Sequence, residues 1–335
     1  MTAPLDSAVP SSADTVVRMI GVGGVENLEV ARVSSEGPAP GMVRVRHEAI
    51  GVNFIDIYHR TGLYPLALPA VLGVEAAGLI EDLGKGVTGF SVGNRVAYAG
   101  APVGAYATAR TLPASRLVKL PDSIELLDAA ASMLKGLTAH MLLTRTYAVV
   151  PGTTLLVHGA AGGLGSILVR WAKHLGATVI GTAGSPAKAD IALGYGVDHV
   201  IVGRNADLVS EVRTLTHGIG ADYTIDGIGG DMLLKSLACT RRFGTVASIG
   251  QAAGPIPALA VEEIGPIRSL SLSRPSVMAY VATEDIYPQA AAALLEIMQK
   301  GVIAEIGGEY PLTRAAQAQS DLEAGRTTGS LLLVP

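Results

Sequence analysis

Short apolar runs alternate with amphipathic stretches through the middle of the chain. The runs are typical of strands buried on both faces of a parallel sheet, and they fall at residues 153–158, 177–182, 198–202, 221–226 and 244–250. Segments with a helical apolar face lie between them, at 165–176, 185–196, 205–217 and 230–239. Strands that alternate with helices over residues 151–250 predict an α/β fold with a doubly wound, Rossmann-type sheet.

The flanking segments follow a different pattern. Short strands separated by Gly and Pro are expected at 15–21, 41–52, 74–83, 94–98, 104–110 and 116–119. The C-terminal part predicts helices at 283–300 and 313–323 and a last strand at 329–334, while a helix over 126–146 joins the two patterns. We therefore expect a β-rich domain made of residues 1–136 and 275–335, with a dinucleotide-binding domain, residues 137–274, inserted in it.

A glycine-rich turn follows the first of the central strands, in the sequence VHGAAGGLG. Gly159, Gly162 and Gly165 are spaced three apart where the strand gives way to a helix. Without Cβ atoms, such a turn lets a pyrophosphate approach the free N–H groups of the helix N-terminus. The spacing also suits a tight turn that binds nothing, but the strand and helix pattern around it favours a nucleotide.

The end of the next strand bears on which nucleotide is bound. An NAD-binding unit usually carries Asp or Glu there, which accepts hydrogen bonds from the ribose hydroxyls. Here the sequence is GTAGSPAK, with Gly184 and Ser185 in place of an acid and Lys188 close behind. A 2′-phosphate would be repelled by a carboxylate and attracted by the lysine, so the sequence predicts NADPH rather than NADH. The alternative is that Lys188 is an ordinary solvated helix residue.

Composition narrows the function classes. The 335 residues carry a formal net charge of −4, and the isoelectric point is near 6.0, so we expect no nucleic-acid partner. The single cysteine, Cys239, excludes an internal disulfide and fits a reducing compartment. Since the N-terminus has no signal-peptide pattern and no apolar stretch approaches ~18 residues, we expect a cytoplasmic protein without a membrane contact.

Several motifs together resemble one family over nearly the whole chain. They are GVNFIDIYHRTGLYP (51–65), LGVEAAGLIEDLGKGVTGFSVGNRVAY (72–98), ASMLKGLTAH (131–140), VHGAAGGLG (157–165), RPS (274–276) and GRTTGSLLLVP (325–335). The chain resembles the zinc-free quinone oxidoreductases, related to zeta-crystallin, of the medium-chain dehydrogenase/reductase superfamily. The resemblance implies a GroES-like fold for the β-rich domain.

The residues argue against the superfamily's metal chemistry. Zinc-dependent relatives hold a catalytic metal with Cys and His at the positions that read Asn53 and Val74 here, and neither replaces a thiolate or an imidazole. Without a metal to stabilise an alkoxide, we expect hydride transfer from NADPH to an electron-poor acceptor. A quinone is the leading candidate. The alternatives are an α,β-unsaturated carbonyl (enone or enal), or a non-catalytic NADPH-binding structural protein.

The resemblance also implies site residues. Asn53, Tyr58 and Tyr64 would line the cleft where hydride is transferred, although Asn53 could instead cap a loop and Tyr64 could simply pack on Pro65. The cofactor would be held by Asn53 and by Thr138, Gly162, Gly163, Leu164, Gly184, Ser185, Lys188, Gly203, Arg204, Gly227, Ile249, Gly250, Gln251, Pro275, Ser276 and Arg326. Thr138 could equally bond its own helix backbone, and Arg326 could be a solvated charge. The set contains no metal ligand.

Two positions depart from the family pattern, and one segment predicts assembly. Gly203 stands where relatives often carry a tyrosine, with Arg204 beside it as a possible replacement, and Gly227 stands where a related reductase carries serine. The alternating sequence RSLSLSRPS (268–276) predicts an edge strand after the last strand of the nucleotide sheet. Pairing of this edge with a second copy would give a homodimer, and a loop-covered edge would give a monomer.

Overall fold

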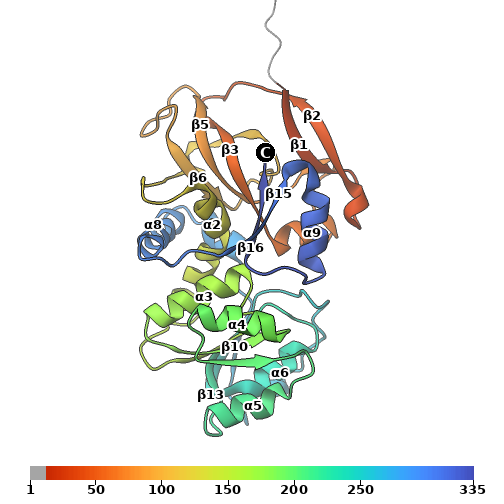
Figure 1. Ribbon diagram of the computed structural model, residues 1–335, viewed down its shortest axis with the longest axis vertical. Helices are drawn as coiled ribbons and strands as arrows, with labels where there is room; N and C mark the ends of the chain where they lie inside the picture. Colours follow the sequence, from red (N-terminus) through yellow and green to blue (C-terminus); the bar gives the residue numbers. More distant parts are fainter. Residues whose placement is uncertain (1–12) are drawn as a thin grey trace, which may run out of the picture.

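The computed structural model describes residues 13–335. The N-terminal stretch, for which we expect no signal peptide, therefore lies mostly outside the described residues. Figure 1 shows a β-rich portion above and a nucleotide-type portion below, with helices α2 (Leu126–His140) and α3 (Gly163–His174) near their junction. Strand β16 (Ser330–Val334) brings the C-terminal end of the chain back to the β-rich portion.

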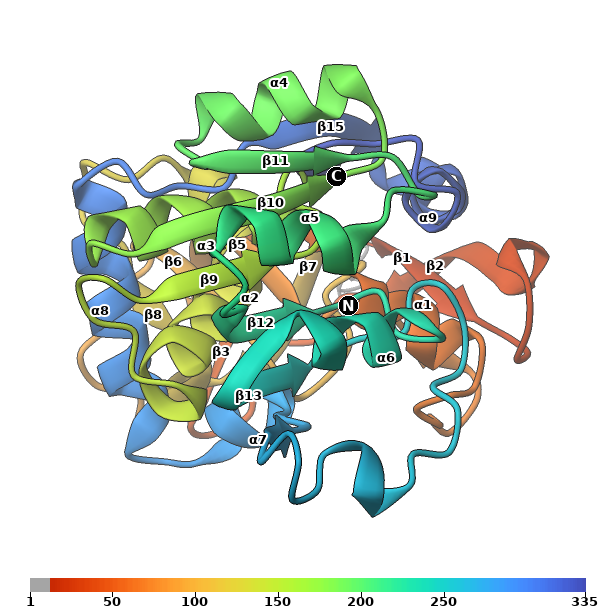
Figure 2. The same cartoon turned by 90° about the horizontal axis from the view of Figure 1, so that it is seen from below.

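The lower portion is the predicted doubly wound sheet. All its strand pairs are parallel, in the order β11-β10-β9-β12-β13-β14. The bounds are β9 Thr154–Val157, β10 Thr178–Ala183, β11 His199–Val202, β12 Ala221–Asp226, β13 Thr240–Ser248 and β14 Ser271–Ser273. Helices α4 (Pro186–Gly194), α5 (Leu208–Leu215) and α6 (Met232–Cys239) complete the connections, and Figure 2 shows α5 and α6 over one face.

Alternation along β9 explains the two layers of helices. Leu155 and Val157 belong to the core cluster that contains α3, while Leu156 belongs to a second cluster with residues of α5 and α6. Successive side chains of a strand point to opposite faces, so an apolar run is buried on both. Cys239 lies in this second cluster, fully buried, as a core residue.

The upper portion is built from largely antiparallel sheets. One has the order β15-β16-β3-β5-β6-β8 with β7 paired to β3, and a smaller one has the order β2-β1-β4. Their bounds are β1 Ala13–Met19, β2 Leu28–Ser34, β3 Met42–Val52, β4 Ala70–Val71, β5 Glu75–Leu83, β6 Arg95–Ala99, β7 Ala109–Pro113, β8 Val118–Lys119 and β15 Ile306–Pro311. Helices α1 (Phe54–Arg60), α7 (Val277–Ala282), α8 (Ile286–Gln299) and α9 (Ala315–Glu323) complete this portion.

Helix α2 ties the two portions together, as the sequence predicted. It contacts β3, β5 and β6 above and α3 below, and it continues as a π-helical turn over Met141–Thr146. One apolar cluster runs through it, from Ala49 on β3 through Leu137 to Leu155 on β9. The two sheets therefore share a core across the junction.

Some sequence expectations need correction. The strand predicted at 104–110 begins only at residue 109, because the backbone N–H groups of Gly104, Ala105 and Tyr106 bond to the carbonyls of Gly73 and Leu72 instead of a strand ladder. The helix predicted at 283–300 starts at residue 286 and is preceded by α7. Strands β2, β4 and β15 and helix α1 were not predicted.

The predicted edge strand at 268–276 is shorter than expected. Only residues 271–273 form β14, because Ser269 has a left-handed backbone (φ 50°). β14 does lie at the edge of the sheet. Leu270, however, is 9% exposed and packs with Leu233, Leu237 and Val246, so it belongs to the core and not to an exposed edge.

Candidate functional site: the junction of the two sheets

The glycine-rich turn leads from β9 into α3. Gly159 has φ +65°, which suits glycine, and Gly162 is the N-cap residue. A Cβ on Gly163 would lie 2.6 Å from Ser330 Oγ, and one on Gly165 would overlap the Gly159 carbonyl. The sequence left open a pyrophosphate site and a tight turn that binds nothing. The structure shows that Gly163 and Gly165 are needed for the packing of the turn itself.

The segment before β16 lies against this turn. Gly329 N donates to the Ala161 carbonyl (3.0 Å), and Gly162 and Gly329 form an isolated parallel bridge. The Lys188 ammonium at the start of α4 donates to the carbonyls of Gly325 (2.8 Å) and Thr327 (2.9 Å). The C-terminal segment is thus held at the edge of the expected nucleotide site.

Two of the three predicted cations gather beside Gly325. Arg204 Nη2 lies 3.5 Å from the Cβ position of Gly325, whose carbonyl accepts from Lys188. Burial lowers the pKa of Lys188, and the nearby Arg204 charge lowers it further. No carboxylate within residues 13–335 forms a salt bridge with either cation. Two like charges held together without an acid attract an anion.

Other predicted residues surround this pair. Ser185 caps α4, its hydroxyl accepting from Lys188 N (3.4 Å), and the Cβ position of Gly184 lies 4.0 Å from Arg204 Nε. Gly203 follows β11 with φ +103°. The third predicted cation, Arg326, is turned toward α9, where its Nε donates to Asp321 Oδ1 (2.9 Å).

The ends of β12 and β13 lie side by side. A Cβ on Gly250 would lie 2.7 Å from the Gly227 carbonyl, and Ile249 N donates to the Asp226 carbonyl (2.8 Å). Glycine at 250 therefore allows these loops to meet. Directly after β9, His158 Nε2 lies 2.9 Å from Ser236 Oγ, which donates to Asp226. This network gives His158 a structural role.

Tyr58 of α1 lies near the end of β13, and Tyr64 follows shortly after that helix. Gln251 N donates to the Tyr58 hydroxyl (2.9 Å), which links the upper and lower portions. Tyr64 lies edge-on to Tyr58, with ring centroids 5.6 Å apart. Burial is the main cause that raises the pKa of Tyr58, and the bond from Gln251 opposes it. Since the Tyr58 oxygen accepts from Gln251, its own proton is free to be donated, and no hydrogen bond inside residues 13–335 takes it up.

Asn53 is the N-cap residue of α1 and lies at the junction of the two portions. It is 7% exposed, and its Nδ2 donates to Glu75 Oε1 (2.7 Å), while Asp56 on the first turn of α1 accepts from its backbone N–H (2.9 Å). Burial raises the pKa of Asp56 to about 7. Asn53 is thus both a helix cap and a buried side chain of the junction, so the two interpretations offered from the sequence are compatible.

The remaining predicted residues take local roles. Thr138 Oγ1 donates to the Leu134 carbonyl (2.7 Å), which is the helix-backbone alternative. Ser276 caps α7 after Pro275, its hydroxyl accepting from Ala279 N (3.3 Å). Leu164 lies in the first turn of α3, partly buried against the main core.

Three residues at the junction escaped the sequence analysis. Glu75 is fully buried and accepts from Lys135 Nζ (2.9 Å), and Arg274 Nη1 donates to the Ser248 carbonyl (3.2 Å) at the end of β13. Glu75, Lys135 and Arg274 lie in the motifs GVEAAG, KGLTA and RPS, respectively. The family resemblance of these motifs could therefore have pointed to them.

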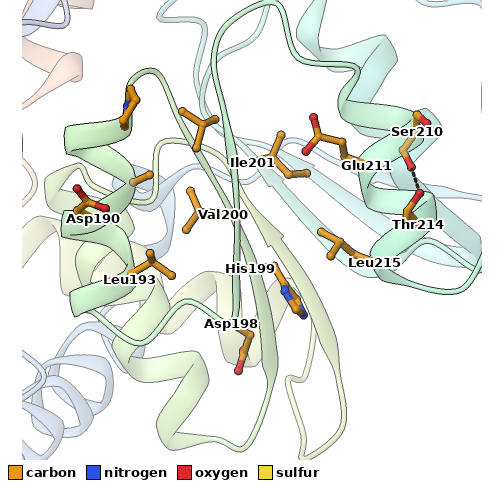
Figure 3. A pocket seen from close by; sticks show the side chains of 13 residues that line it. Asp190, Leu193, Asp198, His199, Val200, Ile201, Ser210, Glu211, Thr214 and Leu215 are labelled. Atoms are coloured by element: carbon orange, nitrogen blue, oxygen red, sulfur yellow. Dashed lines mark hydrogen bonds between the residues drawn. The ribbon is translucent and has the colours of Figure 1, made fainter.

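A separate groove of about 620 Å³ runs beside edge strand β11, between α4 and α5 (Figure 3). Acidic side chains line it, including Asp190, Asp198 and Glu211. One end, at Pro186 and Val202, adjoins the predicted residues Ser185 and Gly203. Its acids do not suit a phosphate, so it is not part of the candidate site.

The part of the chain that the structure describes contains no group of three His, Cys, Asp or Glu side chains placed to hold a metal ion. None of the helices within residues 13–335 combines the length and the hydropathy needed to span a bilayer.

Comparisons with known proteins agree with this architecture. Residues 39–122 match the alcohol dehydrogenase GroES-like domain, and residues 163–296 match the zinc-binding dehydrogenase family. A 2-haloacrylate reductase of Burkholderia sp is 42% identical over 321 residues, covering 93% of this chain and 96% of that protein. A quinone oxidoreductase of Pseudomonas aeruginosa is 41% identical, covering 95% and 99%.

Solved structures give the same result. The crystal structure of Escherichia coli quinone oxidoreductase complexed with NADPH superposes with a TM-score of 0.92 at 38% identity, covering 96% of this chain and all of that one (100%). The fold and the junction therefore define a medium-chain dehydrogenase/reductase. The chain belongs to the quinone oxidoreductase family of that superfamily.

Proposed function

We propose that the protein is an NADPH-dependent quinone reductase that transfers hydride without a metal. The observation that carries the proposal is the meeting of Tyr58 and Gln251 at the carboxyl end of β13, where a proton donor faces the expected nicotinamide end of the sheet. The relatives named quinone oxidoreductase, at about 40% identity over nearly the whole chain, support it.

The residues present fit NADPH. The turn at Gly162–Leu164 offers the N-terminus of α3 to a pyrophosphate. Lys188 and Arg204, which form no salt bridge within residues 13–335, offer two positive charges to a 2′-phosphate. When bound, NADPH supplies a hydride, which is a proton and two electrons, to the acceptor. The chain itself orients the reactants and provides the proton that neutralises the reduced acceptor.

An enone or enal reductase is the second candidate. A 2-haloacrylate is an electron-poor alkene, and the Burkholderia relative with that named activity is 42% identical. The same hydride donor and the same tyrosine serve both acceptors. The acceptor decides between the two functions, and it would lie between Tyr64, which is 40% exposed, and the end of β13.

The test is NADPH oxidation measured against a panel of quinones, enones and aldehydes. We expect turnover with quinones to exceed turnover with enones, and no turnover with saturated aldehydes. Turnover only with enones would make the second candidate the function, and tight NADPH binding without any turnover would favour a structural role.

The finer features are also proposals. We propose that residues 1–136 with 275–335 form the GroES-like domain and 137–274 the nucleotide domain, since the parallel sheet spans β9 to β14 and the two family matches lie on either side of α2. Asn53 and Val74, in place of two zinc ligands, support zinc independence. The exposed end of the sheet at β14 supports a homodimer, and the lone buried Cys239 supports a cytoplasmic location.

A further inference from the structure

Glu75 and Lys135 form a buried ion pair directly behind Asn53. Glu75 is 0% exposed, and the Lys135 side chain is 10% exposed. The Glu75 carboxylate accepts three hydrogen bonds, from Asn53 Nδ2 (2.7 Å), Lys135 Nζ (2.9 Å) and Leu134 N (2.6 Å). A Cβ on Gly51 would overlap the Glu75 side chain, so the glycine makes room for it.

The chemistry of Glu75 decides which way the Asn53 amide faces. An ionised carboxylate only accepts hydrogen bonds, so the NH₂ group of Asn53 must point to it and the amide oxygen must point away. The Lys135 ammonium and the Leu134 N–H also meet this carboxylate as donors, so it acts as an acceptor toward all three of its partners. The amide oxygen then faces the first turn of α1, where Asn53 caps the helix, and its second lone pair would accept from a hydroxyl, such as one of a ribose.

Lys135 connects the same pair to the glycine-rich turn. Its Cε lies 3.0 Å from the Cβ position of Gly163, the first residue of α3, so its aliphatic chain crosses the start of that helix. The ion pair therefore spans the distance from the turn expected to hold the pyrophosphate to the amide expected at the nicotinamide end. The apolar cluster around Leu137 also holds α2 to the upper sheet, so this packing does not rest on the ion pair alone.

We propose that Glu75 and Lys135 are positioning residues that fix the Asn53 amide for the nicotinamide half of the cofactor. This inference rests on the proposed function, since it assumes that NADPH binds at this junction. Without Glu75 the amide can turn over, and without Lys135 the carboxylate loses its charge partner. The adenosine half, which Lys188 and Arg204 would hold, does not depend on the pair.

The experiment uses Glu75→Gln, Lys135→Met, the double variant and Lys135→Arg. Binding of NADPH and of an adenosine bisphosphate that carries the 2′-phosphate is titrated for each protein without an acceptor. Melting temperature without ligand is measured in parallel. Glu81→Gln is the matched control, because Glu81 lies on the same strand, β5, but pairs with Arg44 and Arg46 outside the junction.

We expect each single change to lower the melting temperature, because it leaves one buried charge alone, and the double variant to regain most of it. NADPH binding should stay about tenfold weaker in Glu75→Gln and in the double variant, while binding of the adenosine bisphosphate stays at the wild-type value. Lys135→Arg should keep most NADPH affinity, and Glu81→Gln all of it.

The inference is overturned if the double variant regains both its melting temperature and its NADPH affinity, since the pair would then serve stability alone. It is also overturned if the affinities for NADPH and for the adenosine bisphosphate fall together. Wild-type protein that binds no NADPH would instead overturn the proposed function, so the two failures are distinguishable.

Discussion

Gly203 stands where relatives often carry a tyrosine, and the neighbouring Arg204 lies close to Lys188, a pairing that the sequence alone does not reveal. Lys188 is engaged by two carbonyls of the C-terminal segment, whereas Arg204 has no salt bridge within residues 13–335. A 2′-phosphate would have to draw Lys188 away from those carbonyls, but it would find Arg204 without a competing acid. We therefore propose that Arg204 compensates for the missing tyrosine by its charge.

We predict that Arg204→Ala weakens NADPH binding by at least as much as Lys188→Ala, about tenfold or ~1.4 kcal/mol, with little change for NADH. The reason is that only NADPH carries the phosphate. Fluorescence titration of both cofactors measures it, with Lys173→Ala as the control, because Lys173 pairs with Asp198 away from the site. Equal losses for NADH and NADPH would contradict the assignment.

We propose that Tyr58 protonates the reduced acceptor, because its hydroxyl accepts from Gln251 N and keeps its own proton to donate. After hydride transfer the acceptor carries a negative oxygen; the Tyr58 O–H bond breaks, its proton joins that oxygen, and solvent reprotonates the phenolate, which the Gln251 N–H stabilises meanwhile. Because burial raises the pKa of Tyr58, the acid form persists through neutral pH.

For Tyr58→Phe we predict a loss of kcat of about 100-fold with unchanged NADPH affinity. In the wild type, kcat should stay level through neutral pH and fall as the pH rises through the raised pKa of Tyr58, because the proton is then already lost. A pH–rate profile measures this, with Tyr195→Phe as a distant control. A Tyr58→Phe enzyme that keeps the wild-type kcat and alkaline limb would rule out this role.

Some of the site residues could be found from the sequence, and others could not. Asn53, Tyr58 and Lys188 stand in short motifs whose chemistry can be read directly. Glu75 and Lys135 are 60 positions apart, and only the packing of α2 on β5 brings them together. A buried charge pair of this kind has no periodic pattern in the sequence.

At the scale of elements, the strands and helices of the parallel sheet were predictable because buried strands are continuous apolar runs. Helix α1, which carries Tyr58, has only seven residues, too few for a helical period to stand out. Strand β2 alternates between half-buried and exposed positions and was missed for lack of a buried face. Short or half-exposed elements depend on their tertiary neighbours.

Strand β14 carries the prediction about assembly. Leu270 is unsuitable for testing it, because it is buried and its N–H donates to the Ile264 carbonyl (3.0 Å). Ser271 is exposed on the edge strand, and two-fold pairing would bring it near its own copy.

We predict that wild-type protein is a dimer and that Ser271→Lys, which adds like charges to the paired edge, makes it a monomer. Light scattering coupled to size exclusion measures both. His199→Lys places the same charge on the opposite edge strand, β11, and should leave the dimer intact. A wild-type mass near 34.2 kDa would refute the prediction.

For the whole molecule, the sequence predicted that the parallel sheet lies between two parts of a β-rich portion. The signal was the strand pattern that reappears at the C-terminal end of the chain, at residues 329–334. The order β15-β16-β3-β5 could not be predicted, since antiparallel partners far apart in sequence leave no local signal. Helix α2 and the segment before β16 hold the sheets together on either side of the glycine turn. The candidate site combines residues of both portions, so it depends on this junction.

We expect the junction to reduce quinones with NADPH and without a metal. The rate of NADPH oxidation by a quinone is measured before and after chelator dialysis, with elemental analysis of the same sample. Equal rates and no stoichiometric zinc are expected, because Asn53 and Val74 do not supply the thiolate and imidazole of a zinc site. A rate that is lost on dialysis and restored by one zinc per chain would show a metal-dependent enzyme instead.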